Sequence, residues 1–116
     1  MPTSLPAPSR RAVLALPLLA ALGPARAAAA SVRIENFVFS PALLVVAPGS
    51  VVTWTNADDI PHVVAAEDGS FHSPALDTDE RFAARFERPG QVRYFCALHP
   101  HMVGVIEIRA SAEASP

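Results

Sequence analysis

The chain has 116 residues, a hydrophobic fraction of 51% and a formal net charge of −2. This length is enough for one small domain. The acidic balance excludes the basic surface that nucleic-acid binding requires, and it disfavours adsorption to anionic lipid.

The first 27 residues are predicted to be a cleavable export signal. Arg10 and Arg11 precede an apolar run of 11 residues, 12–22, which is shorter than the about 20 residues of a membrane span. Residues 25–27, Ala-Arg-Ala, have the A-x-A form of a cleavage site. The paired arginines favour the twin-arginine route, and a general secretory signal is the alternative. Removing residues 1–27 leaves six arginines against eleven acidic residues, a net charge of −5, and predicts a soluble periplasmic protein.

Residues 28–110 are predicted to form one all-β domain, because short apolar stretches alternate with turns that contain Pro or Gly. Within residues 51–56, Trp54 shares one face with Val52 and Asn56, so it is expected in the core. Residues 68–80 are expected to form a polar loop, and residues 111–116 a flexible C-terminal tail. The pattern predicts a β-sandwich with strands at residues 32–39, 43–47, 51–56, 62–66, 82–86, 91–96 and 104–109.

The chain contains a single cysteine, Cys96. Exported proteins usually pair their cysteines, so a lone thiol is either buried and inert or protected, for example by a metal. His99 and Met102 follow it in a C-x2-H-x2-M pattern at the end of an apolar strand, and His62 lies 34 residues earlier, directly after a proline. Because distant strand ends meet at one pole of a sandwich, His62, Cys96, His99 and Met102 are the predicted metal ligands.

The types of these four donors select the metal. A thiolate and two imidazoles with a weak axial thioether form the arrangement of blue-copper sites. Zinc accepts Cys and His, but a structural zinc site is normally closed by a further thiolate, imidazole or carboxylate. Calcium and magnesium prefer oxygen ligands. One copper ion that cycles between Cu(I) and Cu(II) is therefore the predicted cofactor.

These motifs resemble the cupredoxin family of type 1 blue-copper proteins, and the short ligand loop is most similar to the amicyanin and plastocyanin-like members. The resemblance implies a Greek-key β-sandwich with copper at one end. It also implies that His99 reaches the surface through an apolar patch where partners dock. The segments that carry the resemblance are Thr53–Asn56, Pro61–His62, Pro89–Gly90, and Tyr94–Met102 followed by Gly104.

Three positions depart from the family pattern. Val63 and Ala97 stand where relatives commonly carry the polar side chains that tie the two ligand loops together. Both halves of that link are missing together, which avoids leaving one of them unsatisfied. His101 stands where amicyanins have phenylalanine, and it is expected to point away from the metal.

Two further groups of side chains are expected to be solvated. His72 lies in the polar loop and is expected to be a surface residue. The acidic residues are expected to form a solvated face, available to steer a basic partner at long range; they are Asp58, Asp59, Asp77, Asp79 and Glu80.

The sequence favours an exported one-electron carrier that works between redox proteins and is not an enzyme. A c-type cytochrome or a dehydrogenase or reductase is expected to dock transiently near His99, with the carrier itself a monomer. The alternative is a copper-binding protein for periplasmic delivery or buffering. An oxidase or reductase would need further copper sites or an open coordination position.

Overall fold

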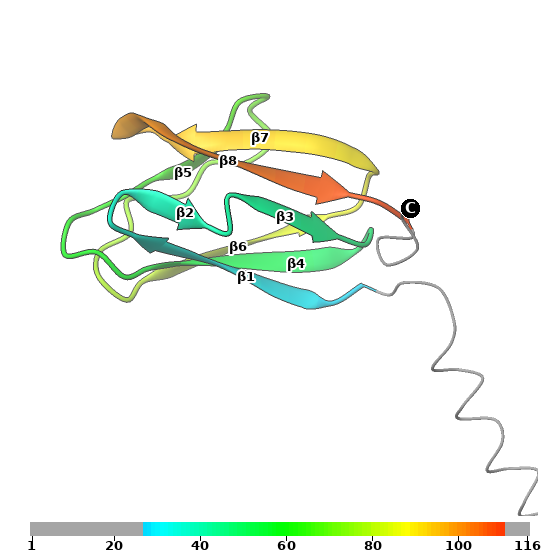
Figure 1. The fold of residues 1–116 in the computed structure, drawn as a ribbon, viewed down its shortest axis with the longest axis horizontal. Coiled ribbons are helices and arrows are strands. Elements are labelled where there is room, and N and C mark those ends of the chain that lie inside the picture. Colours follow the sequence, from blue (N-terminus) through cyan, green and yellow to red (C-terminus); the bar gives the residue numbers. More distant parts are fainter. Residues whose placement is uncertain (1–26, 111–116) are drawn as a thin grey trace, which may run out of the picture.

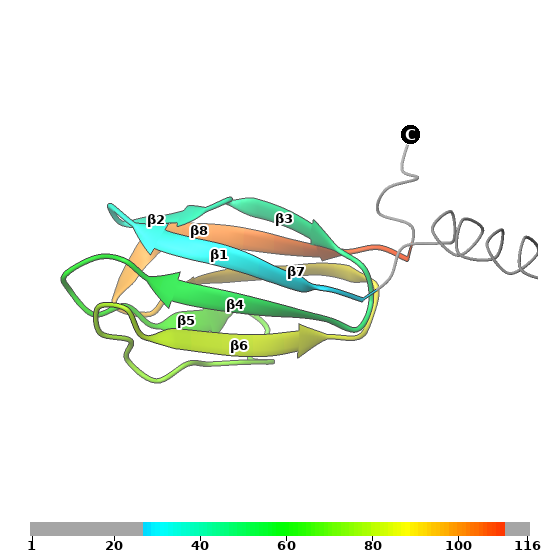
Figure 2. The same ribbon diagram turned by 90° about the horizontal axis from the view of Figure 1, so that it is seen from below.

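A computed structural model describes residues 27–110, which form eight strands in two facing sheets (Figures 1 and 2). The predicted all-β Greek-key sandwich is confirmed, and this part of the chain contains no helix long and apolar enough to cross a membrane. The predicted signal, apart from its last residue, and the predicted tail lie outside the described residues. The strands are β1 (Ala29–Glu35), β2 (Val38–Ser40), β3 (Leu43–Val46), β4 (Ser50–Asn56), β5 (Val64–Ala66), β6 (Arg81–Phe86), β7 (Gly90–Cys96) and β8 (His99–Ile108).

The strand order explains how distant segments meet. One sheet has the order β2-β1-β4-β6 and the other β3-β8-β7-β5. β1 runs parallel to β4 and β3 runs parallel to β8, whereas the other pairs are antiparallel. The β1–β2 turn, the β4–β5 loop and the β7–β8 turn therefore gather at one pole (Figures 1 and 2). This pole lies opposite the end where β1 begins and β8 ends.

The core lies between the sheets and combines aliphatic side chains with a group of packed aromatic rings. Val52, Trp54 and Asn56 of β4 are each 0% exposed, as the alternation in the sequence predicts. Trp54 packs edge-on against Tyr94 with ring centroids 5.2 Å apart, and Tyr94 packs against Phe39 at 4.7 Å. Burial raises the pKa of Tyr94 to about 12, so its phenol stays neutral in this apolar environment.

Three strands differ in extent from their predictions. The expected strand 32–39 is divided into β1 and β2 by a turn at Asn36 and Phe37, which have φ values of 58° and 62°. β5 begins at Val64, and His62 makes only an isolated bridge. β8 begins at His99 instead of residue 104, because a two-residue turn lets His99 pair directly with Cys96.

Gly104 is required by the aromatic ring that faces it across the β7–β8 pair. Tyr94 is the register partner of Gly104. A Cβ built on Gly104 would overlap Cζ and the hydroxyl oxygen of Tyr94 and would lie 2.8 Å from its Cε1. The glycine thus leaves the space in which the Tyr94 ring lies flat against the strand.

We expect Gly104→Ala to lower the free energy of unfolding by about 1–3 kcal/mol, because a buried ring must move to admit a methyl group. Chemical denaturation of the two proteins measures this difference. In a Tyr94→Leu background the same substitution should cost less, since the ring that it strikes is gone. A change smaller than about 0.5 kcal/mol in the original background, typical of innocuous surface substitutions, would contradict the argument.

Candidate metal centre

Two of the predicted ligands are brought together by one hairpin. Cys96 ends β7 and His99 begins β8, and the two residues are register partners across the turn at Ala97 and Leu98. An irregularity of the ladder between Phe95 and Cys96 bends the strand at this point. The spacing C-x2-H therefore has a structural cause, because it is the spacing of a two-residue hairpin turn.

The third predicted ligand, His62, reaches the same place from the β4–β5 loop. Its backbone N–H donates to Leu76 O at 3.1 Å, and Leu76 N–H donates back to His62 O at 2.8 Å. The His62 side chain is 0% exposed, whereas His99 is half-buried. One imidazole is thus enclosed by the protein, and the other lies at its surface.

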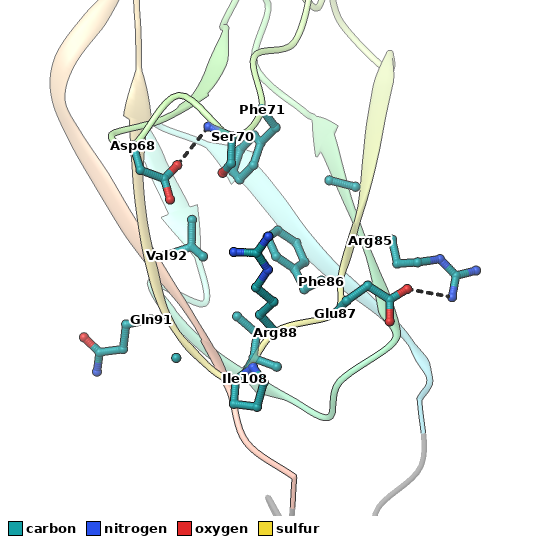
Figure 3. Close-up of a pocket in the computed structure, with 13 residues that line it drawn as sticks. Asp68, Ser70, Phe71, Arg85, Phe86, Glu87, Arg88, Gln91, Val92 and Ile108 are labelled. Carbon is teal, nitrogen blue, oxygen red and sulfur yellow. Dashed lines mark hydrogen bonds and ion pairs between the residues drawn. The ribbon is translucent and has the colours of Figure 1, made fainter.

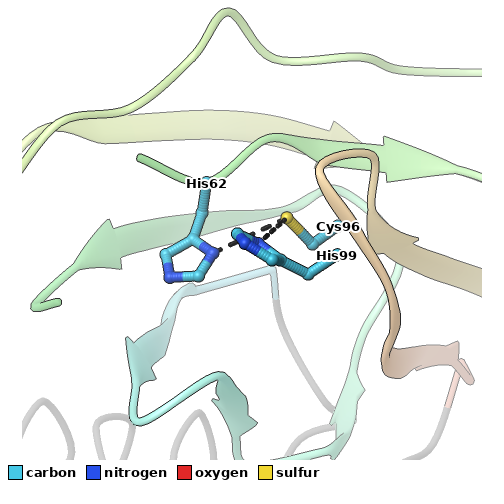
Figure 4. A group of neighbouring side chains, drawn as sticks. All are labelled: His62, Cys96 and His99. Carbon is cyan, nitrogen blue, oxygen red and sulfur yellow. Dashed lines mark hydrogen bonds between the residues drawn. The ribbon is translucent and has the colours of Figure 1, made fainter. Parts of the chain in front are cut away.

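The donor atoms converge on one point. The Nδ1 atoms of His62 and His99 each lie 3.6 Å from Cys96 Sγ, and both rings are directed toward the sulfur (Figure 4). All three potential ligand atoms lie within 4.8 Å of one another. The sequence prediction that these residues meet at one pole is confirmed by this geometry.

These distances fit a single metal ion. An ion bonded to sulfur at about 2.3 Å and to nitrogen at about 2.0 Å, as zinc is in proteins, spans about 3.7 Å between them at an angle of about 120°. The two S···N distances of 3.6 Å match this trigonal arrangement. A thiol carries one proton and cannot donate to two ring nitrogens at once, so a cation satisfies the cluster better than hydrogen bonds do.

Backbone groups join the two ligand loops where the family's polar side chains are missing. The Val63 N–H donates to Cys96 Sγ at 3.4 Å. The Ala97 N–H donates to Val63 O at 3.1 Å. The loops are therefore connected through main-chain hydrogen bonds that do not depend on the side chains at positions 63 and 97.

Met102, the fourth predicted ligand, lies in β8 and is 3% exposed. It belongs to the buried apolar cluster that also contains Cys96 and Tyr94. Its role as the axial ligand stays a prediction, based on the C-x2-H-x2-M pattern.

The other two histidines lie outside the donor cluster. His72 and His101 are exposed, and His72 Nδ1 contacts Ser73 O at 3.0 Å. Neither belongs to the group of three side chains whose donor atoms converge. His72 was expected at the surface and His101 was expected to point away from the metal, and both predictions are confirmed.

Asp58 corrects the prediction of a uniformly solvated acidic face. Asp59, Asp77, Asp79 and Glu80 are exposed as expected. The Asp58 side chain is only 12% exposed, and its Oδ2 lies 2.8 Å from Nε2 of His62.

The Asp58 carboxylate is ionised more easily than usual. Burial opposes its charge, but hydrogen bonds from the Asn36 N–H, the His62 ring and the Phe37 N–H outweigh burial and hold the pKa below its usual value. With His62 Nε2–H donating to this carboxylate, Nδ1 keeps its lone pair for a metal.

Phe37 is the second residue near the site that the sequence reasoning missed. Its ring centroid lies 5.0 Å from that of His99 and 5.6 Å from that of His62, edge-on to both. It is 44% exposed. Apolar residues alternate up to Ile34, but Phe37 follows Ile34 after three residues instead of two, with Asn36 between them. This break in the alternation is the sequence signal that could have found the turn.

A cleft of about 440 Å³ lies away from this cluster, beside the β6–β7 turn (Figure 3). Its walls include Phe71, Phe86 and Val92 and the charged side chains of Asp68 and Arg88. None of the four predicted ligands lines this cleft. The cleft is therefore a feature separate from the metal centre.

Comparisons with known proteins agree with this geometry. Residues 26–109 match the family described as copper binding proteins, plastocyanin/azurin family. Amicyanin-alpha of Methylorubrum extorquens is 32% identical over 105 residues, which cover 86% of this chain and 88% of that protein.

Solved structures give the same fold. A purple cupredoxin from Nitrosopumilus maritimus is 34% identical with a TM-score of 0.65, over 69% of this chain and 99% of that chain. The copper-containing nitrite reductase of Thermus scotoductus SA-01 is 27% identical with a TM-score of 0.65, over 69% of this chain and 22% of that chain. With a donor cluster of one thiol and two imidazoles on this fold, the chain belongs to the plastocyanin/azurin family of copper-binding proteins, and its cofactor is copper.

Proposed function

We propose that this protein is a periplasmic one-electron carrier whose copper is held by His62, Cys96, His99 and Met102. The observation that carries the proposal is the convergence of Cys96 Sγ with two imidazole Nδ1 atoms at 3.6 Å each, at the pole of a β-sandwich. A thiolate with two imidazoles and a weak thioether is the donor set of electron-transfer copper sites. Export through the predicted signal at residues 1–27 is part of the proposal.

Different residues of the chain would shield the copper and contact a partner. Copper, when bound, supplies the one-electron couple. Cys96 and His62 are 0% exposed and hold the centre away from water, whereas the half-buried His99 gives the shortest contact with the outside. Leu98 and Phe37 are exposed apolar side chains in the turns that carry or contact His99. An exposed ligand edge beside apolar side chains suits brief docking of a redox protein, and we propose no enzymatic activity.

The thiolate of Cys96 provides the first test. We expect the Cu(II) protein to show an intense blue thiolate-to-copper absorption band, and Cys96→Ser to abolish it, because an alkoxide or hydroxyl does not replace the soft sulfur donor. Visible absorption of both proteins after titration with Cu(II) measures this. His101→Ala is the matched control, because His101 is exposed and lies outside the donor cluster, and it should keep the band. A colourless wild-type complex would refute the proposal.

Met102 provides the second test. We expect Met102→Leu, which preserves apolar volume, to keep the thiolate band and raise the reduction potential, because loss of an axial donor leaves Cu(II) less stabilised than Cu(I). Voltammetry of the two proteins measures the change. Val103→Leu, at the exposed neighbouring position, should leave the potential unchanged. An unchanged potential in Met102→Leu would remove Met102 from the ligand set.

Retention of the metal separates a carrier from a delivery protein. A carrier should lose Cu(I) slowly to a competing chelator, because two of its three clustered donors are fully buried. Rapid loss, complete within seconds of mixing, would favour the alternative of copper delivery or buffering. The measurement is stopped-flow absorbance of the chelator complex.

A further inference from the structure

The Asp58 carboxylate connects two segments that are far apart in the sequence. Its Oδ2 lies 2.8 Å from His62 Nε2 and accepts the Phe37 N–H at 3.1 Å, and its Oδ1 accepts the Asn36 N–H at 2.7 Å. Three N–H groups therefore converge on two oxygens. One of them belongs to a predicted copper ligand, and the other two belong to the β1–β2 turn.

Asp58 is itself held in place from both sides. Its N–H donates to Asn56 Oδ1 at 2.9 Å, and its carbonyl oxygen accepts the Thr78 hydroxyl at 2.7 Å. Asn56 is 0% exposed, and its Nδ2 donates to Ile60 O and Leu76 O, at 2.9 and 2.8 Å. Since every hydrogen-bonding group of this arrangement is engaged, the position of the carboxylate is determined by the fold and not by solvent.

The turn that Asp58 holds has an unfavourable backbone. Asn36 tolerates a φ of 58°, but Phe37 has a φ of 62°, which is uncommon for a bulky side chain. Such conformations cost about 1–3 kcal/mol and persist only where surrounding contacts hold them. In this turn those contacts are the two N–H bonds to the carboxylate, and the Phe37 ring lies nearly perpendicular to both imidazoles.

We infer that Asp58 is a positioning residue of the copper centre, which fixes the His62 ring through Nε2 and clamps the Asn36–Phe37 turn so that the Phe37 ring closes over His62 and His99. The inference rests on the proposed ligands. A carboxylate on the outer nitrogen of a ligating histidine fixes its tautomer and raises its basicity. Higher basicity at Nδ1 favours Cu(II) over Cu(I), so Asp58 lowers the reduction potential.

Asp58→Asn in the copper-loaded protein tests this inference, with Asp59→Asn as the matched control. Both substitutions remove one negative charge at neighbouring positions, but Asp59 is exposed and lies outside the donor cluster. An asparagine offers one acceptor oxygen in place of two, so His62 loses its carboxylate. We expect Asp58→Asn to lower Cu(II) affinity about 10–100-fold. At a fixed ambient potential it should shift the Cu(I)/Cu(II) ratio about tenfold toward Cu(I), which is about 59 mV for one electron.

The clamp has its own readout. In the diamagnetic Cu(I) protein, amide hydrogen exchange of Asn36 or Phe37 should be at least about tenfold faster in Asp58→Asn than in wild type, and unchanged in Asp59→Asn. The two N–H groups donate to different carboxylate oxygens, and asparagine keeps only one of them as an acceptor. Equal potentials and equal exchange rates for the two variants would overturn the inference.

A wild-type measurement covers the case in which Asp58→Asn does not fold. The His62 Nε2–H signal of the wild-type Cu(I) protein should be observable and slow to exchange with solvent, and rapid exchange would overturn the inference. Failure of the proposed function can be distinguished from failure of the inference about Asp58, since it would appear as a colourless wild-type Cu(II) complex. An intact blue band with no difference between the two variants would overturn only the role of Asp58.

Discussion

The metal centre depends on a main-chain constraint, the pairing of β5 with β7 beside the β7–β8 hairpin. Val64 is the register partner of Cys96, and Cys96 is the register partner of His99. The hydrogen bond from Ala97 N–H to Val63 O extends this pairing past the end of β5, so that His62 is carried against the sulfur. Three donors from two loops therefore meet through backbone hydrogen bonds that side-chain substitutions in the loops leave intact.

Buried polar side chains at the same pole have hydrogen-bond partners. His62, Cys96 and Asn56 are each 0% exposed at the edge of the apolar core, and an unpaired polar group there would cost about 1–3 kcal/mol. Asn56 bonds backbone carbonyls of Ile60 and Leu76, and His62 bonds Asp58, so each group has a partner. The polar network is thus complete except for the lone pairs that face Cys96 Sγ. Those lone pairs are what a soft cation satisfies, which couples binding of the metal to the stability of the pole.

The sequence predicted the sandwich and the three converging donors because both depend on short-range patterns. The alternation in β4 and the C-x2-H-x2-M spacing are readable without tertiary information, whereas the two-residue hairpin between Cys96 and His99 was not predicted. The β1–β2 turn was missed because it contains neither Gly nor Pro and because the apolar pattern resumes after it. Asp58 was missed because its neighbour Asp59 is solvated and the two look alike in sequence. Its burial depends on the β1–β2 turn, which comes from a different part of the chain. Contacts of that kind are set by strand order, which composition and spacing do not specify.

The two histidines of the site have different surroundings, and each is expected to affect a different property, the reduction potential for His62 and partner docking for His99. His62 is enclosed, and Asp58 and the backbone of Leu76 hold it, so a change on this side acts on the equilibrium between the oxidation states. His99 is half-buried beside the exposed ring of Phe37, so in the proposed carrier a change on this side acts on how a partner approaches. Phe37 touches both rings, and Asp58 holds both His62 and the turn that carries Phe37. In the proposed carrier, a single substitution in the β1–β2 turn or at Asp58 can therefore alter the potential and the docking surface together.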